Sequence, residues 1–533
     1  MATFHREPVG KFALQGRRFL RALSCCAQVA VLVGCGEDGS AASPQRAGDA
    51  GTDAGEAARF SPADCSEVRL ADPDEGVECG WVTVPRDHGQ PKRETLDLAV
   101  AVLKATGAQP APDPIVFLQG GPGASGVERI FERYRSDMLA YWRKTRDVVL
   151  FDQRGTGANR PDLDCPEYDE AFLAAWSEPL SRDEEIAMLV EAMRACHARL
   201  VDAGVDLRVY TSAQSALDVG DIMRALGHSD YNLYGVSYGG RLALTVMRDA
   251  PEGVRSVVLD SPVPIGPKRS FAHNAEAAFK VLDAACTADS KCAATYPKLE
   301  RTLAETATRL DREPLSVAST ARDARPLIVN GPRALISLFG AMYVRNVAVW
   351  LPLAITQLSQ GIPGVWGTYV NGYVDEVART RYTEAMAYSI LCSDDYPFES
   401  MTHGRDLAAV SAPYNSLDQF DFQTLGACAF WNVRAPDPKE NETVRSDIPA
   451  LILSGSLDPI APHAYAEEIG KSLSRSQEVF FKGIGHGVVR TMTGEDVPRC
   501  AERMTQAFYD SPTDPLDTSC QADIPDIVWS GAL

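Results

Sequence analysis

Residues 231–240 read Tyr-Asn-Leu-Tyr-Gly-Val-Ser-Tyr-Gly-Gly. The first four residues predict a short apolar strand, and the stretch 241–247 predicts a helix. The Gly-x-Ser-x-Gly sequence between them predicts a very tight turn, because glycine at positions 235 and 239 removes side chains that would clash. Ser237 is therefore expected to project from the carboxyl end of a strand, where a serine serves as a nucleophile.

Further apolar runs predict the strands around this turn. They lie at 96–103, 114–118, 147–151 and 254–260. Parallel strands joined by helices, with a serine turn at their carboxyl edge, are the arrangement of α/β-hydrolases. We therefore expect an α/β fold of this type with a mostly parallel sheet. The alternative is a chance occurrence of the short motif, and each further motif weakens it.

A glycine-rich loop follows the run at 114–118 and reads Gln-Gly-Gly-Pro-Gly-Ala-Ser. Backbone N–H groups in such a loop can turn toward a substrate oxygen and form an oxyanion hole. We expect one donor from Gly121 and the other from Tyr238, directly after the nucleophile. The alternative is a plain Gly/Pro turn. Asp152 and Arg154, in the Asp-Gln-Arg-Gly loop after the next strand, are expected to brace the loops beneath the site.

The remaining catalytic groups are expected late in the chain, because α/β-hydrolases carry them in the order serine, acid, histidine. Asp458 follows the predicted strand at 449–455, and His486 follows the one at 478–482 in a glycine-rich loop. Asp458 is expected to orient the His486 ring, and His486 to act as the base. The alternatives are that Asp458 is only a turn residue, and that His463 is the base.

Three motifs together carry a family resemblance: Gly-Gly-Pro-Gly after one strand, Asp-Gln-Arg-Gly after the next, and Gly-Val-Ser-Tyr-Gly-Gly at the turn. They resemble the prolyl iminopeptidase and tripeptidyl aminopeptidase family over 80–265 and 385–505. Gln119 stands where prolyl iminopeptidases often have histidine. This difference, the N-terminal extension and the many cysteines favour the secreted tripeptidyl-type branch. The resemblance implies an inserted helical cap, no cofactor and no metal.

The resemblance also implies a substrate class, namely peptides that lose a short N-terminal unit of one to three residues. An aminopeptidase must recognise a free α-ammonium group, and carboxylates can do so. The Cys-Ser-Asp-Asp segment at 392–395 resembles a Cys-x-Asp segment of the tripeptidyl branch, so Asp394 is the first candidate and Asp395 the second. A structural role for these acids is the alternative. Two other functions stay open: an esterase or amidase on small non-peptide substrates, and a non-catalytic peptide-binding surface lipoprotein.

The N-terminus predicts a processing signal. Basic residues at 17, 18 and 21 precede an apolar stretch at 22–34 that is too short to span a bilayer. The stretch ends in Leu-Val-Gly-Cys, which resembles a bacterial lipobox with Cys35 as the lipidated residue. We therefore expect an exported protein that is lipid-anchored in the bacterial cell envelope, or secreted if the lipobox is not used.

The expected organisation follows from these segments. It comprises a lipoprotein signal peptide at 1–35, a flexible Gly/Ala/Ser/Asp-rich tether at 36–60, the first part of the hydrolase core at 61–266, a helical cap at 267–445, and the second part of the core at 446–533. The formal net charge is −20 at pH 7. Such a surface repels nucleic acid and anionic membranes, so short peptides are the expected partners and the lipid the only membrane contact. Nothing in the sequence gives the oligomeric state.

Ten of the thirteen cysteines lie after Cys35. An even number in an exported chain predicts disulfides. Pairing of sequential neighbours gives 65–79, 165–196, 286–292, 392–428 and 500–520, a connectivity that sequence alone leaves open. Metal binding is the competing use, but the spacings contain no Cys-x-x-Cys pair and no nearby histidine cluster. The last of these pairs gives the core a disulfide-bearing C-terminal segment.

Overall fold

The computed structural model describes residues 58–266, 270–320, 325–362, 364–379, 382–398, 408–435, 437–491 and 499–531. The chain separates into two compact units, Met1–Asp53 and Ala54–Leu533, and the described residues all belong to the second. The predicted signal peptide with Cys35, and most of the predicted tether, therefore lie outside the described residues. Strand β1 begins at Arg59, within the last two positions assigned to the tether.

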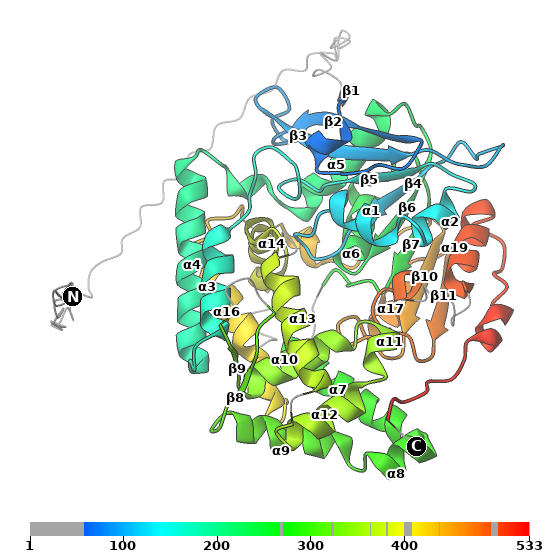
Figure 1. The fold of residues 1–533 in the computed structure, drawn as a ribbon. Helices are drawn as coiled ribbons and strands as arrows, with labels where there is room; N and C mark the ends of the chain where they lie inside the picture. Colours follow the sequence, from blue (N-terminus) through cyan, green and yellow to red (C-terminus); the bar gives the residue numbers. More distant parts are fainter. Residues whose placement is uncertain are drawn as a thin grey trace, which may run out of the picture. The chain divides into compact units, whose positions relative to one another are not determined.

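A nine-stranded sheet organises this unit, in the order β1-β2-β3-β5-β4-β6-β7-β10-β11 (Figure 1). β1, β2, β3 and β5 pair antiparallel with one another in turn, and every pair from β5 to β11 is parallel. The expected α/β fold with a mostly parallel sheet is confirmed. The strands are β1 (Arg59–Pro62), β2 (Val77–Pro85), β3 (Thr95–Leu103), β4 (Ile115–Leu118), β5 (Val148–Phe151), β6 (Tyr231–Val236), β7 (Val254–Asp260), β10 (Ala450–Gly455) and β11 (Ser476–Phe481).

Both faces of the central strands are buried, which explains their continuous apolar sequences. Successive side chains of β4 enter opposite cores: Val116 and Leu118 join one cluster, while Ile115 and Phe117 join the other. The second cluster is covered by α1 (Glu128–Tyr134), α2 (Met138–Trp142), α18 (Val488–Thr491) and α19 (Cys500–Asp510). The first is covered by α5 (Ser212–Ala225), α6 (Tyr238–Asp249) and α17 (His463–Gly470).

A largely helical cap lies between β7 and β10 in the sequence (Figure 1). Residues 345–359 form two helices rather than one, because Pro352 occupies the first turn of the second helix. The cap elements are α7 (Phe271–Ala288), α8 (Ser290–Thr295), α9 (Leu299–Leu310), β8 (Leu315–Val317), β9 (Leu327–Val329), α10 (Gly331–Ala341), α11 (Arg345–Ala348), α12 (Leu351–Ser359), α13 (Val365–Arg379), α14 (Glu384–Ile390) and α16 (Gln419–Cys428).

Two helices from the first half of the chain pack with this cap. They are α3 (Pro166–Trp176), which contacts α13, and α4 (Arg182–Asp202), which contacts α16. Both lie within 61–266, the segment expected from the sequence to form the first part of the core. Short helical turns complete the fold: η1 (Cys65–Val68), η2 (Leu207–Val209), η3 (Leu391–Asp395), η4 (Tyr414–Asp418), η5 (Pro438–Asn441) and η6 (Ser519–Asp523).

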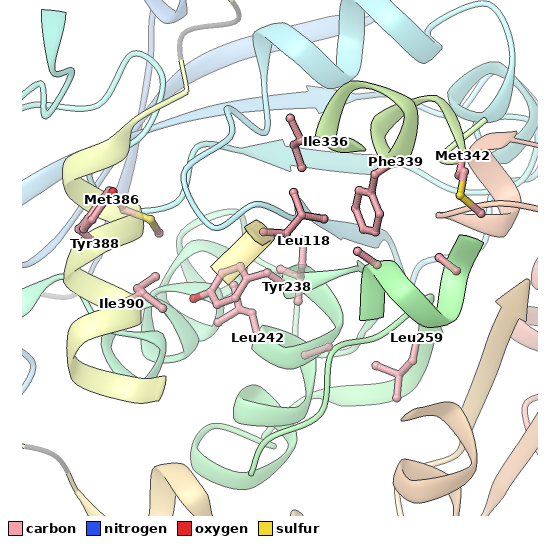
Figure 2. Close-up of a cluster of buried hydrophobic side chains, with 14 of the residues drawn as sticks. Leu118, Tyr238, Leu242, Leu259, Ile336, Phe339, Met342, Met386, Tyr388 and Ile390 are labelled. Atoms are coloured by element: carbon pink, nitrogen blue, oxygen red, sulfur yellow. The ribbon is translucent and has the colours of Figure 1, made fainter. Parts of the chain in front are cut away.

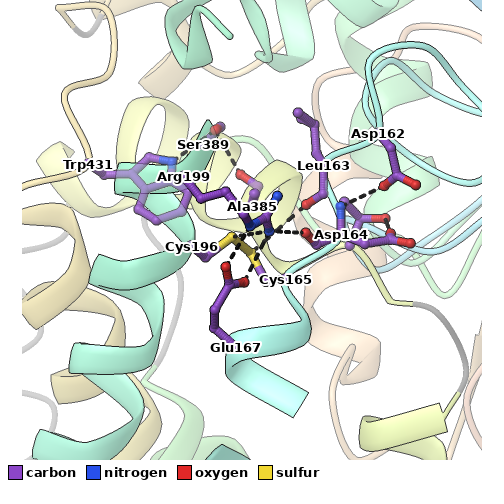
Figure 3. Close-up of a disulfide and its surroundings, with 11 residues drawn as sticks. Asp162, Leu163, Asp164, Cys165, Glu167, Cys196, Arg199, Ala385, Ser389 and Trp431 are labelled. Atoms are coloured by element: carbon purple, nitrogen blue, oxygen red, sulfur yellow. Dashed lines mark hydrogen bonds and ion pairs between the residues drawn. A yellow bond between two sulfur atoms is a disulfide. The ribbon is translucent and has the colours of Figure 1, made fainter. Parts of the chain in front are cut away.

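Five disulfides join the pairs 65–79, 165–196, 286–292, 392–428 and 500–520. The pairing of sequential neighbours is therefore confirmed. Cys165–Cys196 ties the start of α3 to α4, beside Arg199, whose guanidinium donates to Glu167 and to the Asp164 carbonyl (Figure 3). A disulfide of this kind stabilises a fold by about 2–4 kcal/mol, mainly through the unfolded chain.

The cap meets the sheet edge through an apolar junction (Figure 2). Leu118 at the end of β4 and Leu242 of α6 face side chains from α10 and α14. The cap residues at the junction are Ile336, Phe339, Met342, Met386, Tyr388 and Ile390. All of them are buried, so the cap and the core share one hydrophobic interior. In the part of the chain that the structure describes, no helix has the length and apolar character needed to cross a membrane.

An ion pair fixes the loop after β5 to helix α5. The Arg154 side chain is fully buried, and its guanidinium donates to both carboxylate oxygens of Asp218, at 2.8 and 2.6 Å. Asp218 also lies 2.8 Å from the His88 ring, and Arg154 donates to the Val209 carbonyl. Arg154 therefore braces the loops, as expected from the sequence.

We expect Asp218→Asn to lower the free energy of unfolding by about 3–5 kcal/mol, because it leaves the buried Arg154 charge without its partner. Urea unfolding followed by circular dichroism measures the change. Asp202→Asn, at an exposed site on the last residue of α4, is the control and should change the value by less than about 0.5 kcal/mol. Equal effects of the two substitutions would contradict this account of the ion pair.

Candidate active site

Ser237 occupies the turn between β6 and α6. Its φ of +59° and ψ of −124° are unusual for a residue with a side chain. A Cβ at Gly235 would lie 2.3 Å from the Gly239 carbonyl oxygen, and one at Gly239 would lie 2.0 Å from the Leu118 carbonyl oxygen. Both positions thus require glycine, for the steric reason inferred from the sequence. The strand and helix on either side of Ser237 are buried, so the turn is held rigidly.

The glycine-rich loop after β4 passes directly beside Ser237. A Cβ at Gly120 would lie 2.9 Å from the Ser237 Cβ and 3.5 Å from its Oγ. Gly121 and Gly123 have φ of +124° and +112°, which side chains disfavour. The structure therefore places the loop that contains Gly121 next to the serine, and Tyr238 at the first position of α6. These are the positions that two backbone donors of an oxyanion hole occupy.

The loop that follows β5 holds the glycine-rich loop in place through hydrogen bonds. The Gln153 side-chain amide donates to the Gln119 carbonyl at 2.7 Å. The Asp152 carboxylate accepts hydrogen bonds from the Ser125 hydroxyl and from the N–H groups of Gly126, Val127 and Ala158. Burial raises the pKa of Asp152, although these donors act in the opposite direction. Asp152 therefore organises the glycine-rich loop through its backbone.

Asp458 and His486 lie against each other at the ends of β10 and β11. His486 Nδ1 is 3.0 and 2.9 Å from the two carboxylate oxygens of Asp458. Asp458 Oδ1 also accepts the N–H groups of Ile460 and Ala461, which fixes the carboxylate. A proton on Nδ1, facing Asp458, leaves Nε2 of the ring as the acceptor. His463, the alternative base, instead lies 2.8 Å from the Ser454 hydroxyl and begins α17.

Residues at the end of β7 connect the serine turn with the histidine loop. The Ser237 N–H donates to the Asp260 carbonyl at 3.0 Å, and the Gly487 N–H donates to the Ser261 hydroxyl at 2.9 Å. The Asp260 carboxylate accepts the N–H groups of Val488 and Val489. Burial raises its pKa, opposed by these N–H groups and by the Tyr234 hydroxyl. Asp260 and Ser261 were not predicted as site residues, because polar residues at the end of a strand are a weak sequence signal.

The cap also contacts the histidine. The backbone N–H of His486 donates to the Tyr343 carbonyl at 3.0 Å, and the centres of the two rings are 4.9 Å apart. A Cβ at Gly485 would lie 2.4 Å from the same carbonyl oxygen, so this neighbour must be glycine. Burial, with a smaller effect of Asp458, raises the pKa of Tyr343. No sequence pattern indicated Tyr343, which lies in the cap.

Asp394 and Asp395 lie near the start of α6, and both have partners within the protein. Asp394 accepts the Ser212 N–H at 2.9 Å and the Ser393 hydroxyl at 2.6 Å. Asp395 forms a buried ion pair with Arg241 of α6, with the closest atoms 2.5 Å apart. Burial raises the pKa of Asp394, while Arg241 and these donors lower it. Their role in ammonium recognition stays a prediction, and these contacts favour the structural alternative.

Two family models match the chain. The model of the alpha/beta hydrolase fold matches residues 113–346, and that of TAP-like proteins matches residues 415–520. These matches agree with the sheet, the serine turn and the histidine loop described above. The chain has the α/β-hydrolase fold.

Within this class, the chain is similar to curated peptidases. It is 25% identical to serine protease Hip1 of Mycobacterium tuberculosis over 454 residues, which cover 82% of this chain and 86% of the relative. It is 26% identical to a tripeptidyl aminopeptidase of Streptomyces lividans over 462 residues, 83% of each chain. The putative hydrolase YuaR of Escherichia coli is 22% identical over 432 residues, 76% of this chain and 81% of the relative. The resemblance stated from the motifs is confirmed, and the protein is a hydrolase with peptidase relatives.

We expect Asp458→Asn to lower kcat by about 10⁴-fold, because an amide cannot hold the His486 proton on the ring nitrogen that faces it. Initial rates with p-nitrophenyl acetate measure the effect. Asp447→Asn, at an exposed position before the same strand, is the control and should leave the rate unchanged. A loss smaller than tenfold with Asp458→Asn would remove this carboxylate from the mechanism.

Proposed function

We propose that the protein is a serine peptidase that releases short N-terminal units from peptides through an acyl-enzyme on Ser237. The observation that carries the proposal is the Asp458–His486 pair, joined through the end of β7 to the strained turn that presents Ser237. A nucleophile, a base and a group that orients the base are the set that acyl transfer requires.

The proposed reaction has two stages. In the first, His486 Nε2 accepts the Ser237 proton while Oγ attacks the peptide carbonyl carbon, and the backbone N–H groups of Gly121 and Tyr238 bind the oxyanion. His486 then gives the proton to the departing amine as the C–N bond breaks. In the second stage, His486 activates water, which attacks the ester carbonyl carbon and frees Ser237. The Asp458 carboxylate orients the ring and stabilises the imidazolium in both stages.

Two observations support short peptide substrates. The curated relatives include a tripeptidyl aminopeptidase and a serine protease, each aligned over more than four fifths of this chain. The cap packs onto the sheet edge beside the serine turn, and a cap in this position excludes water and long substrates. An enclosed site favours a free chain end, and the tripeptidyl aminopeptidase relative favours the N-terminal one.

The proposal includes export from the cytoplasm. Five disulfides support an oxidising compartment, since such bonds are rare in reducing ones. Lipidation at Cys35, and attachment to the bacterial envelope through that lipid alone, belong to the same proposal. Labelling of cells with radioactive palmitate, with Cys35→Ser as the comparison, tests the attachment.

We expect the mature protein to cleave chromogenic amides that carry a free N-terminus, and Ser237→Ala to lose this activity together with labelling by a fluorophosphonate probe. The panel carries proline, dipeptide and tripeptide acyl groups, each free and N-acetylated, and the initial rate identifies the preferred length. Equal cleavage of the acetylated series, or of esters alone, would replace the aminopeptidase with a general amidase or esterase. Absence of labelling would favour a non-catalytic binding protein.

A further inference from the structure

The segment that follows α19 runs from the core to the cap, in red in Figure 1. Its start is tied to the core, because Cys520 forms a disulfide with Cys500 of α19. Its far end is tied to the cap, because the Ser530 N–H donates to the Val349 carbonyl at 3.0 Å. We call residues 519–531 the C-terminal strap.

The strap reaches the cap at the short stretch 343–349, which also contacts the histidine loop. The Tyr343 carbonyl accepts the backbone N–H of His486, and the Val349 carbonyl accepts that of Ser530. This stretch of the cap therefore contacts both the loop that carries the proposed base and the strap.

Arg345, within the same stretch, joins the loop and the strap through one side chain. Its guanidinium donates from Nη1 to the Gly483 carbonyl at 3.1 Å and from Nη2 to the Pro525 carbonyl at 2.6 Å. The residue is 5% exposed, and burial lowers its pKa, although Asp526 acts in the opposite direction. A buried guanidinium is costly unless its N–H groups have acceptors, so its position and that of the two carbonyls depend on each other.

Gly483, three residues before the proposed base, is packed against partners from three parts of the chain. A Cβ at this position would lie 2.7 Å from Arg345 Nη1 and 3.1 Å from Ile527 Cγ1. Its backbone N–H donates to the Ser456 hydroxyl at 2.7 Å. The core, the cap and the strap therefore all contact the loop at this residue.

We propose that Arg345 is a positioning residue for the catalytic base, and that the C-terminal strap holds it in that role. The guanidinium fixes the Gly483 carbonyl and, together with the Tyr343 carbonyl, holds the loop that carries the base. The strap supplies the second acceptor, which keeps the guanidinium turned toward the loop. This inference rests on the proposed acyl transfer at Ser237, and it does not depend on the preference for N-terminal units.

The test measures the hydrolysis of p-nitrophenyl acetate by Arg345→Met, Arg345→Lys and the unaltered protein. Methionine cannot donate to the carbonyls, and a misplacement of about 1 Å can lower a rate by about 10²-fold, so we expect kcat to fall by about tenfold to hundredfold. KM should stay within about twofold, because the base acts in both stages of the reaction. Lysine can donate to one of the carbonyls and should recover part of the lost kcat. Arg301→Met, at an exposed position on cap helix α9, is the matched control and should keep the original values.

Complete labelling of Ser237 by a fluorophosphonate probe counts the folded sites, so that kcat refers to these alone. The melting temperature reports stability separately. A lower melting temperature with an unchanged kcat per labelled site overturns the inference, because Arg345 would then serve the fold alone.

The contribution of the strap is tested with a chain that ends at Asp523 and so lacks the Pro525 carbonyl. We expect a similar loss of kcat per labelled site, and no further loss when Arg345→Met is added, because both changes remove one connection. If this chain fails to fold, Trp529→Ala, a buried position in the same segment, is measured in its place. Full activity of the shortened chain or of Trp529→Ala, or losses that multiply, overturns the role of the strap. If the unaltered protein shows no hydrolysis that depends on Ser237, the proposed function fails, and the inference fails with it.

Discussion

The backbone of Gly239 passes the carboxyl end of β4 so closely that a Cβ would lie 2.0 Å from the Leu118 carbonyl oxygen. This contact between the first turn of α6 and the neighbouring strand sets the position of everything else in the site. It draws the helix onto the sheet edge, forces Ser237 into a strained conformation, and brings the glycine-rich loop after Leu118 alongside the serine. A larger residue at 239 would separate the nucleophile from its proposed oxyanion donors.

Several buried acids around this contact share one structural role. The buried acids Asp152, Asp218, Asp260 and Asp394 each accept several donors, and each thereby fixes a loop or helix around the site. These carboxylates are structural because their oxygens are fully used. Glu384 is buried to a similar degree, but one of its oxygens has no partner in the described chain. Burial raises the pKa of Glu384 well above its usual value, because an ionised carboxylate is costly away from water.

Local features of the sequence predicted the parts of the molecule that depend on local interactions. The strand, turn and helix around Ser237 follow from glycines and apolar runs, and the disulfides join nearest neighbours along the chain. Asp458 and His486 were found because each follows a strand in the expected order. The contacts that sequence did not reveal join distant segments: Tyr343 with His486, and Arg241 with Asp395. The lack of a partner at Glu384 is likewise a property of the folded chain alone.

The packing of α3 and α4 with the cap has the same explanation. The sequence assigned both to the first part of the core, and it does not show which partner covers their apolar side chains. In the structure α13 and α16 cover them, and a cavity lies between the two pairs.

The hydrogen bond from the backbone N–H of His486 to the Tyr343 carbonyl makes the position of the histidine loop depend on the cap. A cap that swung away as a rigid lid would carry Tyr343 with it and release the loop that holds the base. An open conformation of that kind would therefore be catalytically silent, and the nucleophile would be activated only after closure. The packing of the cap would in this way decide when the site is competent.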